Sequence, residues 1–272
     1  MINSEQPLKD VQNSNDDRGV NIQKVGINNL DVPLKILRKD GTSVTVSAKA
    51  RLSADLPDKY KGTHMSRFIQ VLSLYGKKNF SQNDIKCLLE DIKKVLKAKS
   101  AHVKFDFKYF IDKKSPVTHL SFPAGYDCSY SGNLSGDGFE FFVKVNVPVT
   151  TLCPCSKEIS QNGAHNQRAV ISVKVKCLEN EVIMPEDLIE TAEECGSCPV
   201  YPLLKRSDEK FVTEKSYSNP KFVEDVLRDL VLKLRNNEKI TGFEVQAEAY
   251  ESIHNHNAWA YQAESLPRTE RR

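Results

Sequence analysis

One order of secondary-structure signals occurs twice along this chain, and this repeat limits the possible folds more than any other feature. In the first half, residues 32–38 and 43–54 alternate between apolar and polar side chains, and a helical region follows. Residues 101–111 alternate again and precede an expected hairpin partner at 117–122. Alternation with a period of two predicts strands with one buried face. The first half is therefore predicted to run strand–strand–helix–helix–strand–strand.

The second half repeats this order without obvious sequence identity to the first. Residues 139–149 and 168–178 alternate as strands, residues 184–195 and 219–237 are expected helices, and residues 242–252 alternate once more. Each half is expected to form an antiparallel sheet with two helices on one face, which is an α+β fold.

The helices have recognisable starts. Residues 66–76 and 81–98 are the helical stretches of the first half, and Ser81 is the expected N-cap of the second stretch. In the last helix of the chain, we expect Asn219 at the N-cap and Pro220 at the first helical position.

The repeat also divides the chain. Residues 1–30 lack regular periodicity and are expected to form an N-terminal arm. Residues 31–130 are the first unit, and residues 131–272 are a second unit that carries most of the reactive side chains. Such a sheet has open edges that another copy of the chain covers well, so we expect an oligomer.

Composition argues against several classes of function. The 272 residues carry a net charge of +3, which is too small for a general nucleic-acid binder. No apolar run approaches the roughly 20 residues of a membrane helix, and the polar start lacks the apolar core of a signal peptide. Seven irregularly spaced cysteines without an export signal favour reduced thiols. We expect a soluble cytoplasmic protein.

Reactive side chains concentrate in the sequence TTLCPCSKEISQNGAHNQR, residues 150–168. Cys153 and Cys155 flank a proline. Such a pair alone is compatible with inert buried thiols, or with a structural zinc site completed by Cys195 and Cys198. A thioredoxin-like redox pair is disfavoured, because its spacing and its βαβ setting are missing.

His165 adds a third interpretation of the same stretch. It lies in polar surroundings together with Arg168. A thiolate, an imidazole and a guanidinium in one loop suit a site that binds and protonates an anion. The alternative is a plain polar hairpin loop.

Glu251, His254 and His256 offer further ligands just after the last predicted strand. In an extended segment the two histidines share one face, since side chains repeat every second residue. Imidazole and carboxylate groups in this arrangement can bind a divalent metal, and a pair of surface histidines is the alternative. The duplicated topology could bring this segment close to residues 150–168.

A second charged region mixes cations with carboxylates. Lys205 and Arg206 precede Asp208 and Glu209, which combines phosphate-type donors with candidate metal or base carboxylates. Glu224 falls in the first turn of the last predicted helix. There it either interacts with the helix dipole or accepts two N–H donors from one edge of a guanine or pterin.

Lys61, His64 and Arg67 stand at the expected start of the first helix. A helix N-terminus favours anions, so these side chains are candidates for binding phosphate. A solvated basic turn explains the same residues, and the pattern alone leaves both interpretations open.

Taken together, these segments resemble the prokaryotic GTP cyclohydrolases of type IB. Five separated blocks agree with that family in order, and the match runs from about Asp10 to Ala258. The blocks are DVQNSNDDRGVNIQKVGI (10–27), LPDKYKGTHMSRF (56–68), LCPCSKEIS with GAHNQR (152–168), LLKRSDEKFVTE with NPKFVED (203–225), and ESIHNHNA (251–258).

The resemblance implies a tandem tunnelling fold (T-fold), with two ββααββ units in one chain and an oligomeric barrel. It implies a homotetramer with active sites between subunits. The implied reaction opens the imidazole ring of guanine in GTP by hydrolysis, giving formate and 7,8-dihydroneopterin triphosphate, the first step of folate and pterin biosynthesis. One divalent metal per active site is implied, either zinc, manganese or iron, with no nucleic-acid or membrane partner.

The same resemblance assigns roles to individual residues. His165 is the implied acid/base group for the purine ring, and Glu224 the implied anchor of the guanine edge. Cys155 and His256 are placed in the pocket without an assigned step. The implied metal ligands are Cys153, Glu209, Glu251 and His254. The implied triphosphate contacts are Lys61, His64, Arg67, Arg168, Lys205 and Arg206.

Two alternatives come from other classes of protein. One is a T-fold nitrile reductase of queuosine biosynthesis, which uses a cysteine nucleophile and a nicotinamide cofactor. The histidine–carboxylate group near the C-terminus and the GAHNQR stretch argue against it. The other is a non-catalytic assembly protein stapled by zinc at Cys153, Cys155, Cys195 and Cys198.

Overall fold

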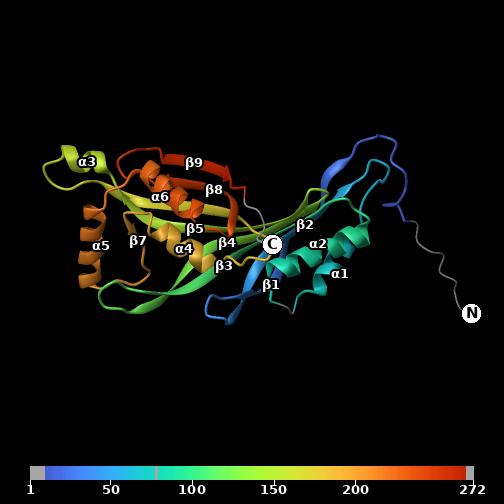
Figure 1. The fold of residues 1–272 in the computed structure, drawn as a ribbon, viewed down its shortest axis with the longest axis horizontal. Helices are drawn as coiled ribbons and strands as arrows, with labels where there is room; N and C mark the ends of the chain where they lie inside the picture. The colour runs from blue at the N-terminus through green and yellow to red at the C-terminus, as the bar shows by residue number, and fades with distance from the viewer. Residues whose placement is uncertain (1–9, 77–78, 268–272) are drawn as a thin grey trace, which may run out of the picture.

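A computed structural model describes residues 10–76 and 79–267, and a long antiparallel sheet runs through this region (Figure 1). Residues 1–9 of the expected arm and residues 268–272 of the expected second unit lie outside the described residues. The strands are β1 (Ile22–Leu37), β2 (Ser43–Leu56), β3 (Ala101–Lys114), β4 (Ser121–Ser135), β5 (Gly138–Leu152), β6 (Asn166–Cys177), β7 (Cys198–Pro199), β8 (Ile240–Ala249) and β9 (Ala258–Ser265). The helices are α1 (Met65–Ser73), α2 (Gln82–Leu96), α3 (Pro154–Ile159), α4 (Pro185–Glu193), α5 (Arg206–Ser218) and α6 (Val223–Arg235).

Apart from the short β7, strands that are adjacent in the sheet follow one another along the chain. The order is β1-β2-β3-β4-β5-β6-β8-β9, each pairing is antiparallel, and the short β7 pairs with β5. The halves join at the β4–β5 hairpin, where Ser135 faces Gly138. The φ angle of Gly138 is 112°, a conformation that glycine adopts without steric cost. The predicted duplication of ββααββ is confirmed, with α3, β7 and α5 added in the second half.

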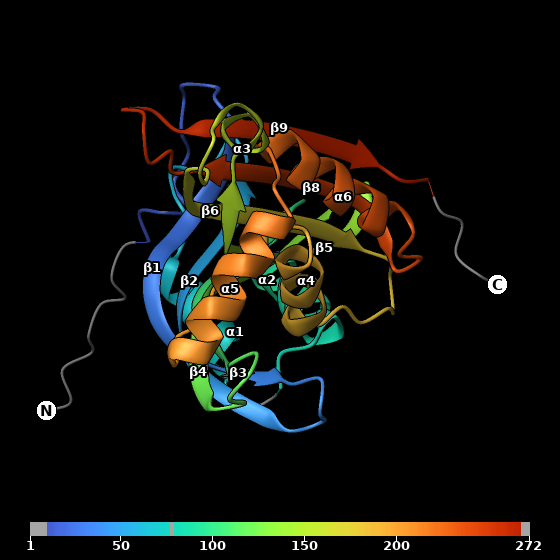
Figure 2. The ribbon, with the colours of Figure 1, turned by 90° about the vertical axis from the view of Figure 1, so that its left-hand side faces the viewer.

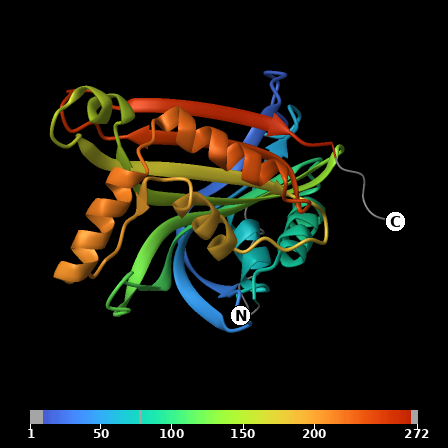
Figure 3. The same cartoon turned by 60° about the vertical axis from the view of Figure 1, so that its left-hand side comes forward.

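Helices pack against one face of the sheet (Figures 1 and 3). α1 and α2 cover the strands of the first half, whereas α4 and α6 cover those of the second half. The alternation predicted for β3 is confirmed, because its expected apolar face is buried. The side chains of that face are Val103, Phe105, Phe107 and Tyr109. None of the helices in the described part of the chain combines the length and the apolar character needed to span a bilayer.

One predicted helix start is confirmed and one is wrong. Ser81 is the N-cap of α2, and its hydroxyl accepts the Asp84 N–H at 3.2 Å. Asn219, in contrast, is the C-cap of α5, and α6 begins at Val223 after the N-cap Phe222. The side-chain amide of Asn219 donates to carbonyl groups of another segment, and residues 219–222 form a non-helical linker before α6.

Several elements differ from the sequence expectation. β1 begins at Ile22, within the stretch expected to form an arm, and β4 starts at Ser121 because residues 115–120 form the turn that precedes it. α3 lies in a stretch that was expected to be a loop, and no element was predicted over α5. Both helices are largely exposed, and in α5 only Asp208 and Ser216 are buried, so hydrophobic periodicity gives no signal for them.

Polar side chains of the first half bind α4 of the second half. The Tyr109 hydroxyl donates to Glu186 Oε1 at 2.5 Å. Lys113 Nζ and the Tyr126 hydroxyl both donate to Glu193 Oε1, at 2.5 and 2.6 Å. Burial lowers the pKa of Lys113, although the neighbouring Glu193 carboxylate opposes this shift. α4 is therefore held on β3 and β4 as well as on its own half.

The packing of α6 predicts a contrast between two leucines of that helix. Leu230 is fully buried, whereas Leu232 is 56% exposed. Leu230→Ala is expected to lower the free energy of unfolding by about 2–5 kcal/mol, because it removes buried methyl groups and leaves a cavity. The matched change Leu232→Ala is expected to cost less than about 1 kcal/mol. Urea unfolding followed by circular dichroism measures both, and equal losses would contradict this packing.

Candidate functional site

The stretch that carries Cys153 and His165 connects β5 to β6 and contains the short helix α3. Cys153 is the N-cap of α3, and its Sγ accepts the Ser156 N–H at 3.4 Å. The Cys153 N–H donates to the His165 carbonyl (3.1 Å), and the His165 N–H donates to the Ser156 hydroxyl (3.0 Å). These contacts join the beginning of the β5–β6 connection to its end, so Cys153 and His165 are held close together. Cys155 is exposed in the first turn of α3.

The imidazole of His165 is oriented by a small polar group. Gln167 Nε2 donates to Thr151 Oγ1 (3.1 Å) and to Glu251 Oε1 (3.3 Å). Gln167 Oε1 therefore accepts from His165 Nδ1 at 3.0 Å, which assigns the proton of the neutral ring to Nδ1. Glu251 Oε2 lies 3.8 Å from the same nitrogen. Among the described residues, no group forms a hydrogen bond with His165 Nε2.

Gln167 and Thr151 are site residues that the sequence reasoning missed. Both stand inside residues 150–168, but neutral polar side chains have no distinctive spacing. They face each other as partners in the β5–β6 ladder, next to the loop that carries Cys153 and His165. Only the strand register reveals that they share a role. Arg168 follows Gln167 in β6, so its side chain lies on the opposite face of the sheet, where it is exposed.

The predicted ligands near the C-terminus separate into two groups. Glu251 contacts Gln167 and lies near His165. His254 and His256 are exposed in the bends between β8 and β9, with their rings stacked 5.0 Å apart. The two histidines are neighbours, as expected, but in a bent segment and not along an extended strand.

Glu224 borders a groove between α6 and the edge strand β9. The groove has a volume of about 510 Å³, and its apolar wall includes Leu227, Val231 and Ala260. Glu224 is exposed in the first turn of α6 and has no hydrogen-bond or ion-pair partner within the described residues. An exposed carboxylate without a partner among the described residues therefore lies at the rim of this groove.

α5 carries another part of the predicted site. Lys205 is its N-cap, Arg206 is its first residue, and Glu209 follows in the first turn. All three belong to a helix that projects at the end of the molecule where α3 also lies (Figure 2). Glu209 is exposed there.

Asp208 is a structural residue of α5. It is fully buried, and its Oδ1 accepts the N–H groups of Val117 and Thr118 at 2.8 and 2.9 Å. Its Oδ2 accepts the Thr118 hydroxyl (2.6 Å) and the Lys205 N–H (2.9 Å). Burial alone would raise the pKa of Asp208, but the hydrogen bonds from Thr118, Lys205 and Val117 hold it well below its usual range. Asp208 thus ties α5 to the β3–β4 turn of the first half.

Lys61, His64 and Arg67 lie far from this end of the molecule. His64 is the N-cap of α1, and its Nε2 lies 3.2 Å from Asp10 Oδ2. Figures 1 and 3 place α1 away from α3 and α5 along the molecule. The single chain therefore does not bring these three predicted phosphate contacts beside Cys153.

The predicted metal ligands do not form a complete site within one chain. Among residues 10–76 and 79–267, no three His, Cys, Asp or Glu side chains are arranged to hold a metal ion. The predicted ligands Cys153, Glu251 and His254 nevertheless offer sulfur, oxygen and nitrogen, which is the chemistry of a zinc, manganese or iron site. Cys195 and Cys198 are buried, and Cys195 Sγ lies 3.2 Å from the Thr191 carbonyl, so they fit a structural role.

Comparisons with known proteins agree with the sequence blocks. A family model described as type I GTP cyclohydrolase folE2 matches residues 8–260. The GTP cyclohydrolase FolE2 of Geotalea uraniireducens is 49% identical over 253 residues, covering 93% of this chain and 92% of that protein. The GTP cyclohydrolase FolE2 of Thermosipho africanus is 48% identical, covering 93% and 96%.

Solved structures with a similar fold include uricases. The uricase of Arthrobacter globiformis has a TM-score of 0.53 at 7% identity, covering 92% of this chain and 95% of that one. The uricase of Bacillus fastidious has a TM-score of 0.54 at 7% identity, covering 90% and 93%. At such low identity the likeness concerns the fold alone, which confirms the predicted tunnelling fold.

The hydrogen bonds of Asp208 predict a pH-dependent loss on mutation. Asp208→Asn is expected to lower the melting temperature at pH 7 by several degrees. Its amide NH₂ group would face N–H or O–H donors that now bind a carboxylate oxygen, so these donors would lose their acceptor. The folded-state pKa is depressed, so the carboxylate stabilises the fold above its unfolded value of about 4 and loses this effect as pH falls toward the folded pKa. The difference from wild type should therefore narrow at about pH 3.

Glu214→Gln is the matched control for Asp208→Asn. Glu214 lies on the same helix in an exposed ion pair with Lys210, so its loss should change the melting temperature little at either pH. Equal melting temperatures of D208N and wild type at pH 7 would show that Asp208 does not hold α5.

Proposed function

This chain belongs to the type I GTP cyclohydrolase FolE2 family, and from this membership we propose that it catalyses hydrolytic opening of the guanine imidazole ring of GTP. The products are formate and 7,8-dihydroneopterin triphosphate, which places the enzyme in folate and pterin biosynthesis. The observation that carries the proposal is the match of 48–49% identity over 93% of the chain. The polar group at His165 and the groove at Glu224 supply the chemistry that the reaction needs.

His165 is suited to move the proton in this reaction. Opening the ring requires water to add to C8 of guanine and a proton to reach N7. Gln167 holds Nδ1 of His165, so Nε2 is the nitrogen that faces proton exchange, and Glu251 stabilises the ring when both nitrogens carry protons. These contacts fix the imidazole before the substrate arrives, which lowers the cost of orientation.

Enzymes of this family generally use a divalent metal, and Cys153, Glu209, Glu251 and His254 are the residues that would hold it. A bound cation of this kind supplies water with a pKa near 7 in place of about 15.7. Zinc, manganese and iron all accept this mixture of sulfur, nitrogen and oxygen donors. Cys155 and His256 stand beside these ligands in sequence and belong to the same pocket.

Glu224 is suited to bind the guanine edge. An ionised carboxylate accepts two hydrogen bonds, which matches adjacent N–H donors of guanine. The apolar wall formed by Leu227, Val231 and Ala260 gives the ring a surface to pack against. Lys205, Arg206 and Arg168 are candidates for the triphosphate.

A second copy of the chain supplies the remaining cations in this proposal. Lys61, His64 and Arg67 lie far from Cys153 within one chain, so they can reach the triphosphate only from a neighbouring subunit. The end strands β1 and β9 offer sheet edges for such an association. A homotetramer with active sites between subunits would bring these cations to the triphosphate and would also cover the exposed sheet edges.

Incubation with GTP and a divalent cation tests the function, and His165→Ala tests the mechanism. The wild-type protein is expected to release formate and, after oxidation, a fluorescent pterin. His165→Ala is expected to lower kcat by about 10²–10⁴-fold, the usual contribution of a general acid or base. His102→Ala, which removes a partly buried histidine bonded to Asn133, should leave kcat unchanged. Consumption of NADPH with a nitrile substrate, and no formate from GTP, would favour the nitrile reductase instead.

Glu224→Gln is expected to act on binding more than on turnover. It replaces a charged acceptor by a neutral amide, so the KM for GTP should rise about 10- to 100-fold while kcat changes less. Glu181→Gln, which removes a surface carboxylate near Lys239, is the control and should keep the wild-type KM. Steady-state kinetics decides, and an unchanged KM in E224Q would remove Glu224 from the guanine site.

A further inference from the structure

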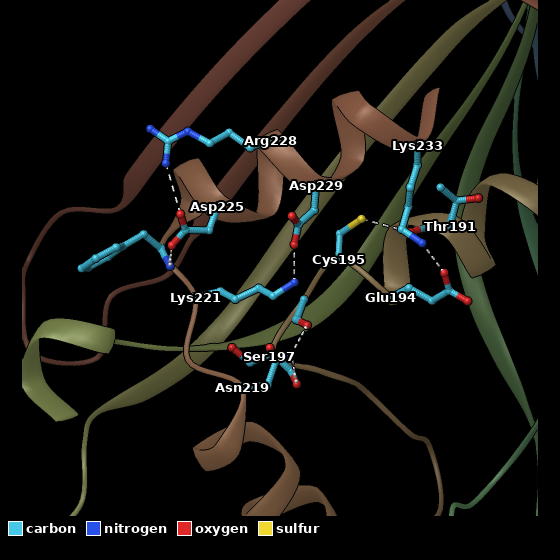
Figure 4. Close-up of polar contacts among 12 residues, drawn as sticks. Thr191, Glu194, Cys195, Ser197, Asn219, Lys221, Asp225, Arg228, Asp229 and Lys233 are labelled. Atoms are coloured by element: carbon cyan, nitrogen blue, oxygen red, sulfur yellow. Dashed lines mark hydrogen bonds and ion pairs between the residues drawn. The ribbon is translucent and has the colours of Figure 1, made fainter. Parts of the chain in front are cut away.

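The four-residue linker 219–222 between α5 and α6 contacts two segments that are distant in sequence (Figure 4). Asn219 Nδ2 donates to the carbonyl groups of Gly196 and Ser197, both at 3.1 Å. The Asn219 N–H donates to the Lys215 carbonyl at the end of α5. The single side chain of Asn219 thus joins the linker to the segment that follows α4.

The segment that Asn219 binds is itself fixed on the end of β5. Ser197 is fully buried, its N–H donates to the Thr150 carbonyl (2.9 Å), and its hydroxyl accepts the Leu152 N–H (3.1 Å). A methyl group on Gly196 would lie 2.6 Å from Val149 Cβ, so the segment packs directly against the strand. Little room exists for it to move.

The linker also contacts β5 directly. The Lys221 N–H donates to the Leu152 carbonyl at 3.0 Å, so both backbone polar groups of Leu152 are engaged by this assembly. Lys221 Nζ pairs with Asp229 Oδ2 at 2.5 Å, which ties the linker to α6 (Figure 4). Leu152 immediately precedes Cys153 in the sequence. Glu224 lies three residues after Lys221, in the first turn of α6.

We infer that Asn219 is a positioning residue that fixes Glu224 relative to Cys153 and His165, an inference that rests on the proposed function. Glu224 anchors the guanine, whereas Cys153 and His165 serve the reacting end of the ring. The linker is the covalent path into α6 and a hydrogen-bond partner of the residue before Cys153. Loss of the Asn219 amide releases the linker from Ser197 and lets the two parts of the site shift against each other.

Such a shift affects turnover more than binding. The contacts of Glu224 with guanine and of the cations with the triphosphate remain in the variant, so GTP still binds. The reacting carbon is then misplaced, and a displacement of about 1 Å can lower the rate by about 100-fold. A purely structural role of Asn219 would instead lower stability and leave the kcat of the folded enzyme unchanged.

The test compares Asn219→Ala and Asn219→Asp with the control Asn237→Ala in the full-length, metal-loaded enzyme. Asn237 is a partly buried asparagine at the opposite end of α6, where its Oδ1 accepts the Lys239 N–H. Both Asn219 variants lose the N–H donors, so kcat is expected to fall at least about 10-fold with a KM for GTP within about threefold of wild type. N237A should keep both constants.

Amide hydrogen exchange without added GTP gives a second readout that does not depend on activity. Peptides covering residues 150–153 and 219–223 are expected to exchange faster in N219A and N219D than in wild type or N237A. If neither variant folds, Asn219→Gln, which keeps an amide but moves it by one methylene away from the carbonyl groups of Gly196 and Ser197, replaces them with the same expectations.

Two outcomes separate this inference from the proposed function. Wild-type protein that releases no formate from GTP would overturn the proposed function and this inference with it. Active wild type together with Asn219 variants of normal kcat, or of unchanged exchange at residues 150–153, would overturn only the positioning role.

Discussion

The backbone ladder between β4 and β5 is the constraint on which the rest of the structure depends. It runs from the pair Asp127–Asn146 to the pair Ser135–Gly138 and joins two half-sheets into one surface. The helices α1, α2, α4 and α6 of both halves pack on the same face of this surface. The connections at one end of this sheet then carry Cys153, His165 and Glu251.

Two carboxylates, one partly buried and one fully buried, extend this link from the backbone to the side chains. Glu193 binds Lys113 and Tyr126, and Asp208 binds the β3–β4 turn at Thr118. A carboxylate taken out of water is costly unless its oxygens receive hydrogen bonds, so each of these contacts specifies where a second-half helix sits. The first half therefore shapes a site whose reactive residues it does not carry.

The reactive residues differ in how firmly the chain holds them. His165 is fixed by Gln167, and Cys153 by backbone contacts on both sides, whereas Glu224 and His254 are exposed at rims. This division suits an enzyme whose proton-transfer group must be oriented in advance while other contacts form on assembly or substrate binding.

The sequence predicted the fold well wherever local pattern reflects burial. Alternation in β3 and the capping residue Ser81 were read correctly, because each depends on neighbours within a few positions. α3 and α5 escaped prediction, since exposed helices have no apolar stripe. The motif blocks identified the family and predicted residues of its site, but their spacing could not show that no three of the predicted ligands meet within the described residues.

By itself, then, the order of residues determined the strand and helix pattern, the duplication and the family, because these are set by side-chain periodicity and by residue identity. Only the tertiary structure decided that Asn219 ends a helix and binds Ser197, that Asp208 is structural, and that Gln167 orients His165. The reason is physical. The hydrogen-bond partner of a polar side chain is chosen by the three-dimensional packing of segments, and in the first two cases the partner lies tens of residues away along the chain.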